Sequence, residues 1–131
     1  MIVIDSSVII AILLSEPEKD VFKDIIAKAD QCVMSAMNGH ETACVVRARL
    51  GTSGVTRLWR MLADSEIEII AFDEAQMRAA ALAFARYGKG IDPKARLNLA
   101  DCAAYALATS LKVPLLFKGN DFAATDVQAA V

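Results

Sequence analysis

Short runs of apolar residues alternate with longer stretches in which apolar residues recur every three or four positions. Four runs rich in Ile, Val and Leu predict buried β-strands: MIVI at the N-terminus, QCVMS, IEIIAF and VPLLF. The stretches between them have helical spacing. They predict helices over 6–14, 36–50, 52–63 and 99–112. Two further helices are predicted from capping boxes: one from Ser15-Glu16-Pro17-Glu18 to about Ala29, and one from Asp73–Gln76 to about Tyr87. Strands that alternate with helices predict an α/β fold, a three-layer α/β/α domain around a mostly parallel sheet.

Length and composition fit one folded domain spanning residues 1–131. Hydrophobic residues make up 56% of the chain and charged residues 23%, which is typical of a protein with a sizeable core. The apolar run Val8–Leu14 is far shorter than the roughly 20 residues that cross a bilayer. The N-terminus lacks the basic residues of a signal peptide. We therefore expect no membrane span and a cytoplasmic location, where the three cysteines stay reduced.

Basic residues are unevenly distributed in this weakly acidic chain. The formal net charge of −2 argues against a general nucleic-acid binder. However, 45–63 holds four arginines and no acid, and 75–100 holds five basic residues against a single acid. If these segments converge, they can receive a polyanion. The candidate phosphate contacts are Arg47, Arg49, Arg86 and Lys89, and the alternative for each is a solvated helix face.

Four carboxylates stand next to apolar segments where a surface acid has no evident purpose. Asp5 follows the first strand, Glu41 lies inside a helix, Asp101 lies near the start of an almost wholly apolar helix, and Asp121 follows the last strand by a few residues. Parallel sheets bind ligands at the carboxyl ends of their strands, so these acids can meet there. Each also has a local alternative: a helix cap for Asp5, a helix-start box with Asn98 for Asp101, an ion pair with Arg49 or a solvated helix stripe for Glu41, and a turn for Asp121.

If the four acids do meet, they require a cation or protons. Two unit charges about 5 Å apart repel by roughly 3 kcal/mol at an effective dielectric near 20. Several such pairs rival the whole stability of a domain. Oxygen ligands without sulfur or imidazole favour Mg²⁺ or Mn²⁺, and such an ion can activate water for phosphodiester hydrolysis. A nucleophilic triad would depend entirely on the single histidine, His40, and no G-x-S-x-G turn supports one, so we assign His40 no catalytic role.

The segments MIVIDSSVIIAILLSEPE, SAMNGHETACVVRAR, LNLADCAAYALA and PLLFKGNDF occur in an order and spacing that resemble PIN-domain nucleases, most closely the VapC-like toxins of toxin–antitoxin systems. The resemblance implies an endoribonuclease in which Asp5, Glu41, Asp101 and Asp121 form an acidic catalytic quartet around Mg²⁺ or Mn²⁺. Asp5, Asp101 and Glu41 would be metal ligands, and Ser6 or Ser7 would orient Asp5.

The resemblance also implies partners. It implies an RNA substrate, a homodimer, and an antitoxin protein whose C-terminal segment covers the active groove. Asn120 departs from the pattern, because relatives often have another acid at this position.

Two other functions compete with this interpretation. VIDSS is similar to the nucleophile strand of haloacid-dehalogenase-like phosphatases, but those enzymes usually carry a second Asp where this chain has Ser7. A non-catalytic partner-binding module is the other alternative. The segments VIIAILL and AAALAFA support it, because they hold more apolar residues than one buried helix stripe needs.

Overall fold

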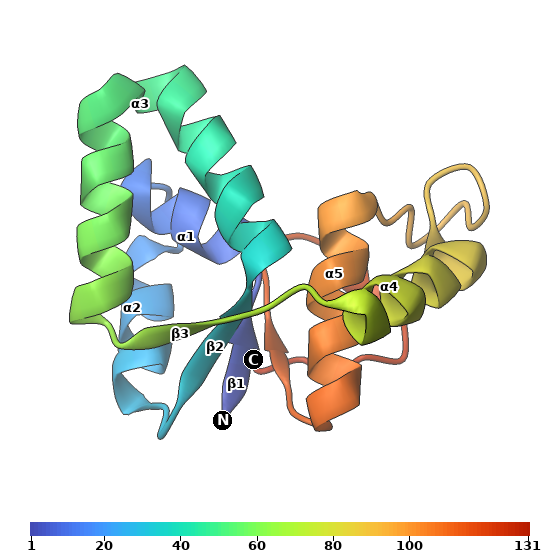
Figure 1. Ribbon diagram of the computed structural model, residues 1–131. Helices are drawn as coiled ribbons and strands as arrows, with labels where there is room; N and C mark the ends of the chain where they lie inside the picture. Colours follow the sequence, from blue (N-terminus) through green and yellow to red (C-terminus); the bar gives the residue numbers. More distant parts are fainter.

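The computed structural model describes all 131 residues and contains one four-stranded sheet (Figure 1). Its strands are β1 (Ile2–Ile4), β2 (Cys32–Ser35), β3 (Ile67–Ile70) and β4 (Leu115–Leu116), in the order β3-β2-β1-β4. Every pairing is parallel. The predicted strands and the parallel sheet are therefore confirmed, and the carboxyl ends of all four strands lie along one edge.

Five α-helices cover the two faces of the sheet. They are α1 (Ser6–Leu13), α2 (Lys19–Lys28), α3 (Ala36–Asp64), α4 (Glu74–Tyr87) and α5 (Leu99–Leu111), and a short 3₁₀ helix, η1 (Phe122–Ala124), follows β4. Figure 1 shows α1, α2 and α3 on one side of the sheet and α4 and α5 on the other. The arrangement is the three-layer α/β/α architecture that the sequence predicts.

Alternating side chains of the central strands divide the core in two. Val3 and Val33 pack against α4 and α5, whereas the next residues, Ile4 and Met34, pack against α1, α2 and α3. Both strands are buried on both faces, because neighbouring side chains of a strand point in opposite directions. This burial explains why β1 and β2 are nearly continuous apolar runs.

Helix α3 contains a sharp bend at Gly51, where φ is 70° and ψ is −163°. A residue with a side chain rarely adopts a positive φ, and glycine does so freely. After the bend the helix runs back alongside its first half (Figure 1). The two helices predicted over 36–50 and 52–63 are thus both present, joined at this glycine.

The predicted capping box at Ser15 is wrong. Ser15 adopts a left-handed conformation (φ 53°), and its N–H donates to Ile12, so it belongs to the turn that ends α1. Helix α2 begins only at Lys19, and its N-cap residue Glu18 makes no side-chain cap bond. At the start of α4, in contrast, Asp73 does cap the helix by accepting from the N–H of Gln76.

The apolar excess of the two helical segments has different outcomes. In α1, the side chains of Val8, Ile9 and Ile12 are all buried in the core, so most of the apolar excess of this segment is used inside the fold. In α4, Leu82 is 74% exposed and Met77 is 50% exposed. Nowhere does the fold contain a helix with both the length and the apolar character that crossing a membrane requires.

Candidate active site

Asp5 lies at the point where β1 ends and α1 begins. Its N–H still donates to Leu116 of β4, while its side chain caps α1. Oδ2 accepts from the N–H of Ser7 at 3.0 Å and from the Ser7 hydroxyl at 2.6 Å. The carboxylate is only 3% exposed. The helix-cap alternative for Asp5 is therefore realised, and of the two candidate serines it is Ser7 that orients this acid.

Asp101 forms the predicted box at the start of α5. Its Oδ2 accepts from the N–H of Asn98 at 3.0 Å, and Asn98 Oδ1 accepts from the N–H of Asp101 at 2.8 Å. Because one oxygen is engaged in this box, Oδ1 is left free of protein donors. The cap role and a ligand role thus use different oxygens of one carboxylate.

Asn38, a fully buried residue of α3 that the sequence reasoning missed, connects these two helix starts. Its Nδ2 lies 3.0 Å from the Ala100 carbonyl oxygen, 3.0 Å from Ser6 Oγ and 3.4 Å from Asp5 Oδ1. Ser6 in turn donates to the Asn38 carbonyl. The available signal was an amide in a helical stripe of buried residues spaced by four, Asn38, Thr42 and Val46.

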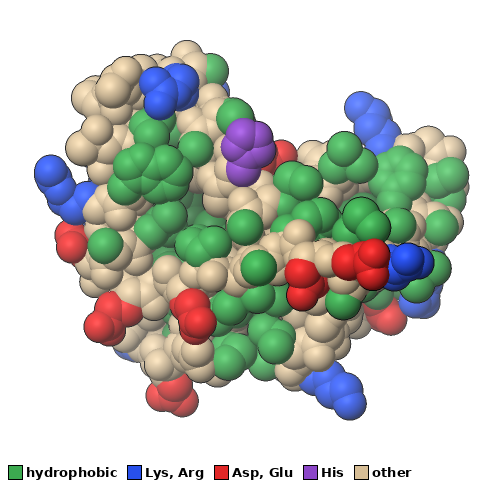
Figure 2. All heavy atoms as spheres, in the orientation of Figure 1, with side chains coloured by type: hydrophobic (Ala, Val, Ile, Leu, Met, Phe, Trp, Pro, Cys, Tyr) green, Lys and Arg blue, Asp and Glu red, His purple; other side chains and the backbone are tan.

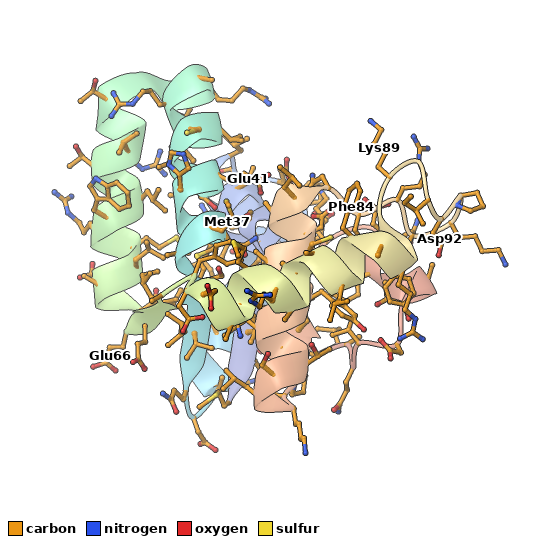
Figure 3. All side chains as sticks on the ribbon, turned by 45° about the vertical axis from the view of Figure 1, so that its right-hand side comes forward. Met37, Glu41, Glu66, Phe84, Lys89 and Asp92 are labelled. Carbon is orange, nitrogen blue, oxygen red and sulfur yellow. The ribbon has the colours of Figure 1, made fainter.

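Glu41 and Asp121 complete the acidic group from two other segments. Glu41 is half-buried on α3, on the side that faces the N-terminal end of α5 (Figure 3), and forms no ion pair with Arg49. Asp121 is exposed just before η1 and makes no side-chain cap bond there. An ion pair with Arg49 therefore does not account for Glu41, whereas Asp121 does lie in a turn, as its local alternative predicted.

Burial and neighbouring acidic charges shift the pKa values of two of the four acids, Asp5 and Asp101. Burial raises the pKa of Asp5 to about 6, against the lowering effect of its Ser7 hydrogen bonds, and the charge of Glu41 raises it further. Burial also raises the pKa of Asp101 to about 7, and the charges of Asp5, Glu41 and Asp121 add to this shift. The four side chains therefore share one region at the carboxyl edge of the sheet.

The donor set fits a hard divalent cation. The candidate ligands offer carboxylate oxygens only, and none of the four acids is neutralised by a salt bridge. As the side chains are placed, no three of them converge into one coordination sphere. Oδ2 of Asp5 and Oδ2 of Asp101 are both engaged with backbone N–H groups.

The predicted phosphate contacts differ in their surroundings. Arg47, Arg49 and Lys89 are exposed, and Lys89 stands on the loop between α4 and α5 (Figure 3). Arg86 already has partners within the protein. It forms an ion pair with Asp126 at 3.4 Å, and its guanidinium carbon lies 4.7 Å from the centre of the Tyr87 ring. On the face drawn in Figure 2, hydrophobic side chains cover the middle and basic side chains stand at the margins.

Comparison with known proteins places this geometry in a family. A family model described as the PIN domain matches residues 2–128. The chain is 42% identical over 127 residues to a ribonuclease VapC of Mycolicibacterium smegmatis, covering 97% of this chain and 98% of the relative. It is 40% identical over 129 residues to ribonuclease VapC42 of Mycobacterium tuberculosis, covering 98% of each.

Solved structures share the fold at low sequence identity. Mycobacterium tuberculosis VapC20, described as a sarcin–ricin loop cleaving toxin, matches with a TM-score of 0.81 at 15% identity over 97% of this chain and 96% of that one. FitAcB of Neisseria gonorrhoeae matches with a TM-score of 0.71 at 23% identity, covering 98% and 96%. With a family match over nearly its full length and relatives at 40% identity, this chain belongs to the PIN domain family.

Proposed function

We propose that this protein is a toxin of a toxin–antitoxin pair that cleaves RNA endonucleolytically with the help of Mg²⁺ or Mn²⁺. The observation that carries the proposal is the buried Asp5, joined through Asn38 to the helix start that holds Asp101. The relatives named ribonuclease VapC support RNA as the substrate. An RNA-cleaving toxin would act in the cytoplasm.

In this proposal Asp5 and Asp101 hold the cation, each through the oxygen that its backbone partners leave free. Glu41 and Asp121 complete the site, either as ligands or through water. When bound, the ion supplies a more acidic water and neutralises charge on the phosphate. Because one oxygen of each of Asp5 and Asp101 is fixed by backbone N–H groups, these two carboxylates keep their orientation when substrate arrives.

The proposed protein partners are an antitoxin and a second copy of the chain. The solved structures that share the fold include a toxin–antitoxin complex from Klebsiella pneumoniae and VapBC2 of Rickettsia felis bound to promoter DNA. Leu82 of α4, which is 74% exposed, is the apolar side chain around which we propose that a homodimer forms. Light scattering of the purified chain, with and without L82E, tests the dimer.

The phosphatase alternative loses its support in this geometry. An aspartyl-phosphate mechanism requires a second acid near the position of Ser7. That serine instead binds Asp5 through both its N–H and its hydroxyl.

The decisive experiment incubates the purified chain with Mn²⁺ or Mg²⁺ and total RNA, and maps the new RNA ends by sequencing. We expect discrete internal cuts that require the metal and disappear in D5N. The matched control is D30N, which changes an exposed aspartate at the opposite end of the sheet and should cut like the parent. Cutting by D5N at the parental rate, or none by the parent under any metal, would contradict the proposal. A DNA of matching sequence in a parallel reaction tests the preference for RNA.

A further inference from the structure

Lys118 lies between β4 and Asp121, and its ammonium group is held by two glutamates from the turn between α1 and α2. Lys118 Nζ is 2.8 Å from Glu16 Oε1 and 3.0 Å from Glu18 Oε2. The three side chains are between 32% and 38% exposed. This bridge joins segments 100 or more residues apart in the sequence.

The α1–α2 turn presents the glutamates to this lysine and not to its own helix. Ser15 takes a left-handed conformation, and the Glu16 N–H closes the turn onto Ala11 at 2.8 Å. Glu18 occupies the N-cap position of α2 without a side-chain cap bond, and its Oε2 atom is buried. A buried carboxylate oxygen is costly without a partner, and the charge that compensates this one is Lys118.

The backbone of Lys118 contacts the site directly. Its N–H donates to Ser7 Oγ at 3.0 Å, and Ser7 Oγ donates to Asp5 Oδ2 at 2.6 Å. Three residues further on stands Asp121, after a turn in which Gly119 has a φ of 98°. Lys118 is thereby fixed through both its side chain and its main chain. It is linked to Asp5 through Ser7, and it precedes Asp121 by three residues.

We propose that Lys118 is a positioning residue: the Glu16–Lys118–Glu18 bridge holds residues 117–121 against Ser7, and so orders Asp5 and Asp121 for cation binding. The part concerning the cation rests on the proposed function. A direct phosphate contact is the other obvious role for a lysine near this site. Two glutamates already surround this ammonium, so the bridge as a whole is negatively charged and has no free cation to offer.

The experiment compares K118M with the matched control K28M, which removes an exposed lysine from the Lys28–Asp24 pair. Two properties of the purified, metal-free proteins are measured: amide hydrogen exchange of 117–122, and Mn²⁺ affinity by calorimetry. In K118M we expect at least tenfold faster exchange in this segment and about tenfold weaker Mn²⁺ binding, as is typical of lost outer-shell support. In K28M both should match the parent.

Two further variants separate positioning from simple destabilisation. E16Q/E18Q leaves the lysine in place but removes its anchors, and it should reproduce both effects of K118M. K118R keeps the charge and should restore most of the parental Mn²⁺ affinity. If K118M does not fold, the single variant E16Q carries the same two measurements with a smaller expected change.

The proposal is overturned if exchange of 117–122 in K118M, or in E16Q where K118M does not fold, equals that of K28M, or if these variants bind Mn²⁺ as tightly as the parent. It is also overturned if K118M loses RNA affinity in a D5N background while exchange stays parental, because this result assigns the lysine to phosphate. A parent that binds no Mn²⁺ contradicts the proposed function instead, and the exchange measurement then still decides whether the bridge orders the segment.

Discussion

Ser7 is joined to Asp5 by two hydrogen bonds that end on the same carboxylate oxygen. Its N–H and its hydroxyl donate to Oδ2 at 3.0 and 2.6 Å. Oδ2 is therefore fixed, while Oδ1 points towards Asn38 at 3.4 Å. One serine thus sets the orientation of a buried acid and leaves only Oδ1 of that acid free of bonds to Ser7.

Replacing this serine should weaken cation binding without unfolding the protein. S7A keeps the backbone bond but loses both bonds of the hydroxyl, the one to Asp5 and the one from the Lys118 N–H. We therefore expect a ten- to hundredfold loss of Mn²⁺ affinity by calorimetry. The pKa of Asp5 should also rise further, because the Ser7 hydroxyl lowers it in the parent. S7T retains a hydroxyl and should recover most of the affinity.

The matched control for S7A is S53A, which removes an exposed hydroxyl in the second half of α3. It should bind Mn²⁺ like the parent. Equal affinities of S7A and S53A would show that the backbone bond alone is sufficient to orient Asp5.

Asp101 has two roles with opposite effects on stability. Its box with Asn98 stabilises α5, and its charge repels the other acids of the site. D101N keeps an acceptor for the Asn98 N–H but removes the charge, so metal-free D101N should be at least as stable as the parent in urea unfolding. D101A loses the box as well and should be about 1 kcal/mol less stable than D101N.

Both substitutions should abolish RNA cleavage, so activity and stability move independently in D101N. A loss of about 2 kcal/mol or more in D101N would mean that Asp101 is chiefly a structural cap and that repulsion among the acids is negligible.

The sequence predicted those features that local pattern determines. The run Ile2–Ile4 followed by Asp5 predicted both a strand and an acid at its carboxyl end, and the spacing of Asn98 and Asp101 predicted the start of α5. These signals come from residues close together in the sequence, and each element follows either the strand or the helix repeat of apolar residues. The grouping of Asp5 with Asp101 is contained in no local pattern; the ligand-binding edge of a parallel sheet suggested it, and the family resemblance implied it.

The features that the sequence did not predict depend on contacts between distant segments. Ser15 has the spacing of a capping box, yet the glutamates around it are used by Lys118, 102 residues after Glu16. Arg86 lies in a basic segment, yet its partner Asp126 follows 40 residues later. Charge excess and cap spacing are properties of neighbouring residues, so they cannot report partners that only the fold supplies.

Asn38 should be critical for stability, because its amide serves two helix starts and a buried acid. N38A leaves the Ala100 carbonyl oxygen without this donor, and we expect a loss of about 2 kcal/mol at pH 7. N38D places a second carboxylate beside Asp5 and should be less stable still. The difference between N38D and N38A should shrink at pH 5, where a protonated acid can donate.

Urea unfolding at the two pH values measures this effect, with N120A as the control for an exposed asparagine. If N38D is more stable than N38A at pH 7, charge repulsion between residue 38 and Asp5 does not destabilise the fold.

Replacing the exposed basic residues should change the salt dependence of RNA binding if these residues contact RNA phosphates. Each phosphate contact that is lost lowers the slope of log affinity against log salt by about 1. In an inactive D5N background we expect this decrease for R47A, R49A and K89A. R86A should leave the slope unchanged, because Arg86 is paired with Asp126. Unchanged slopes for the first three variants would remove them from the RNA surface.

Stability without metal should decrease as the pH rises from 5 to 8. The pKa values of Asp5 and Asp101 are raised to about 6 and about 7, above the ordinary value of 3.8. Between these limits the folded chain binds more protons than the unfolded chain, so raising the pH through 6 and 7 removes stability. One pKa unit corresponds to about 1.4 kcal/mol, and the loss should amount to a few kcal/mol.

No other shifted group should obscure this trend. The pKa of Asp126 is lowered from 3.8, and the shifted cysteine, tyrosine and lysine groups titrate above pH 8. D5N/D101N should flatten the profile, and saturating Mn²⁺ should stabilise the parent most at pH 8, where both acids are charged. Urea unfolding from pH 5 to 8 measures all three profiles. A metal-free parent whose stability is constant or rises over this range would show that charging Asp5 and Asp101 does not destabilise the folded state, so that a cation has no such destabilisation to offset.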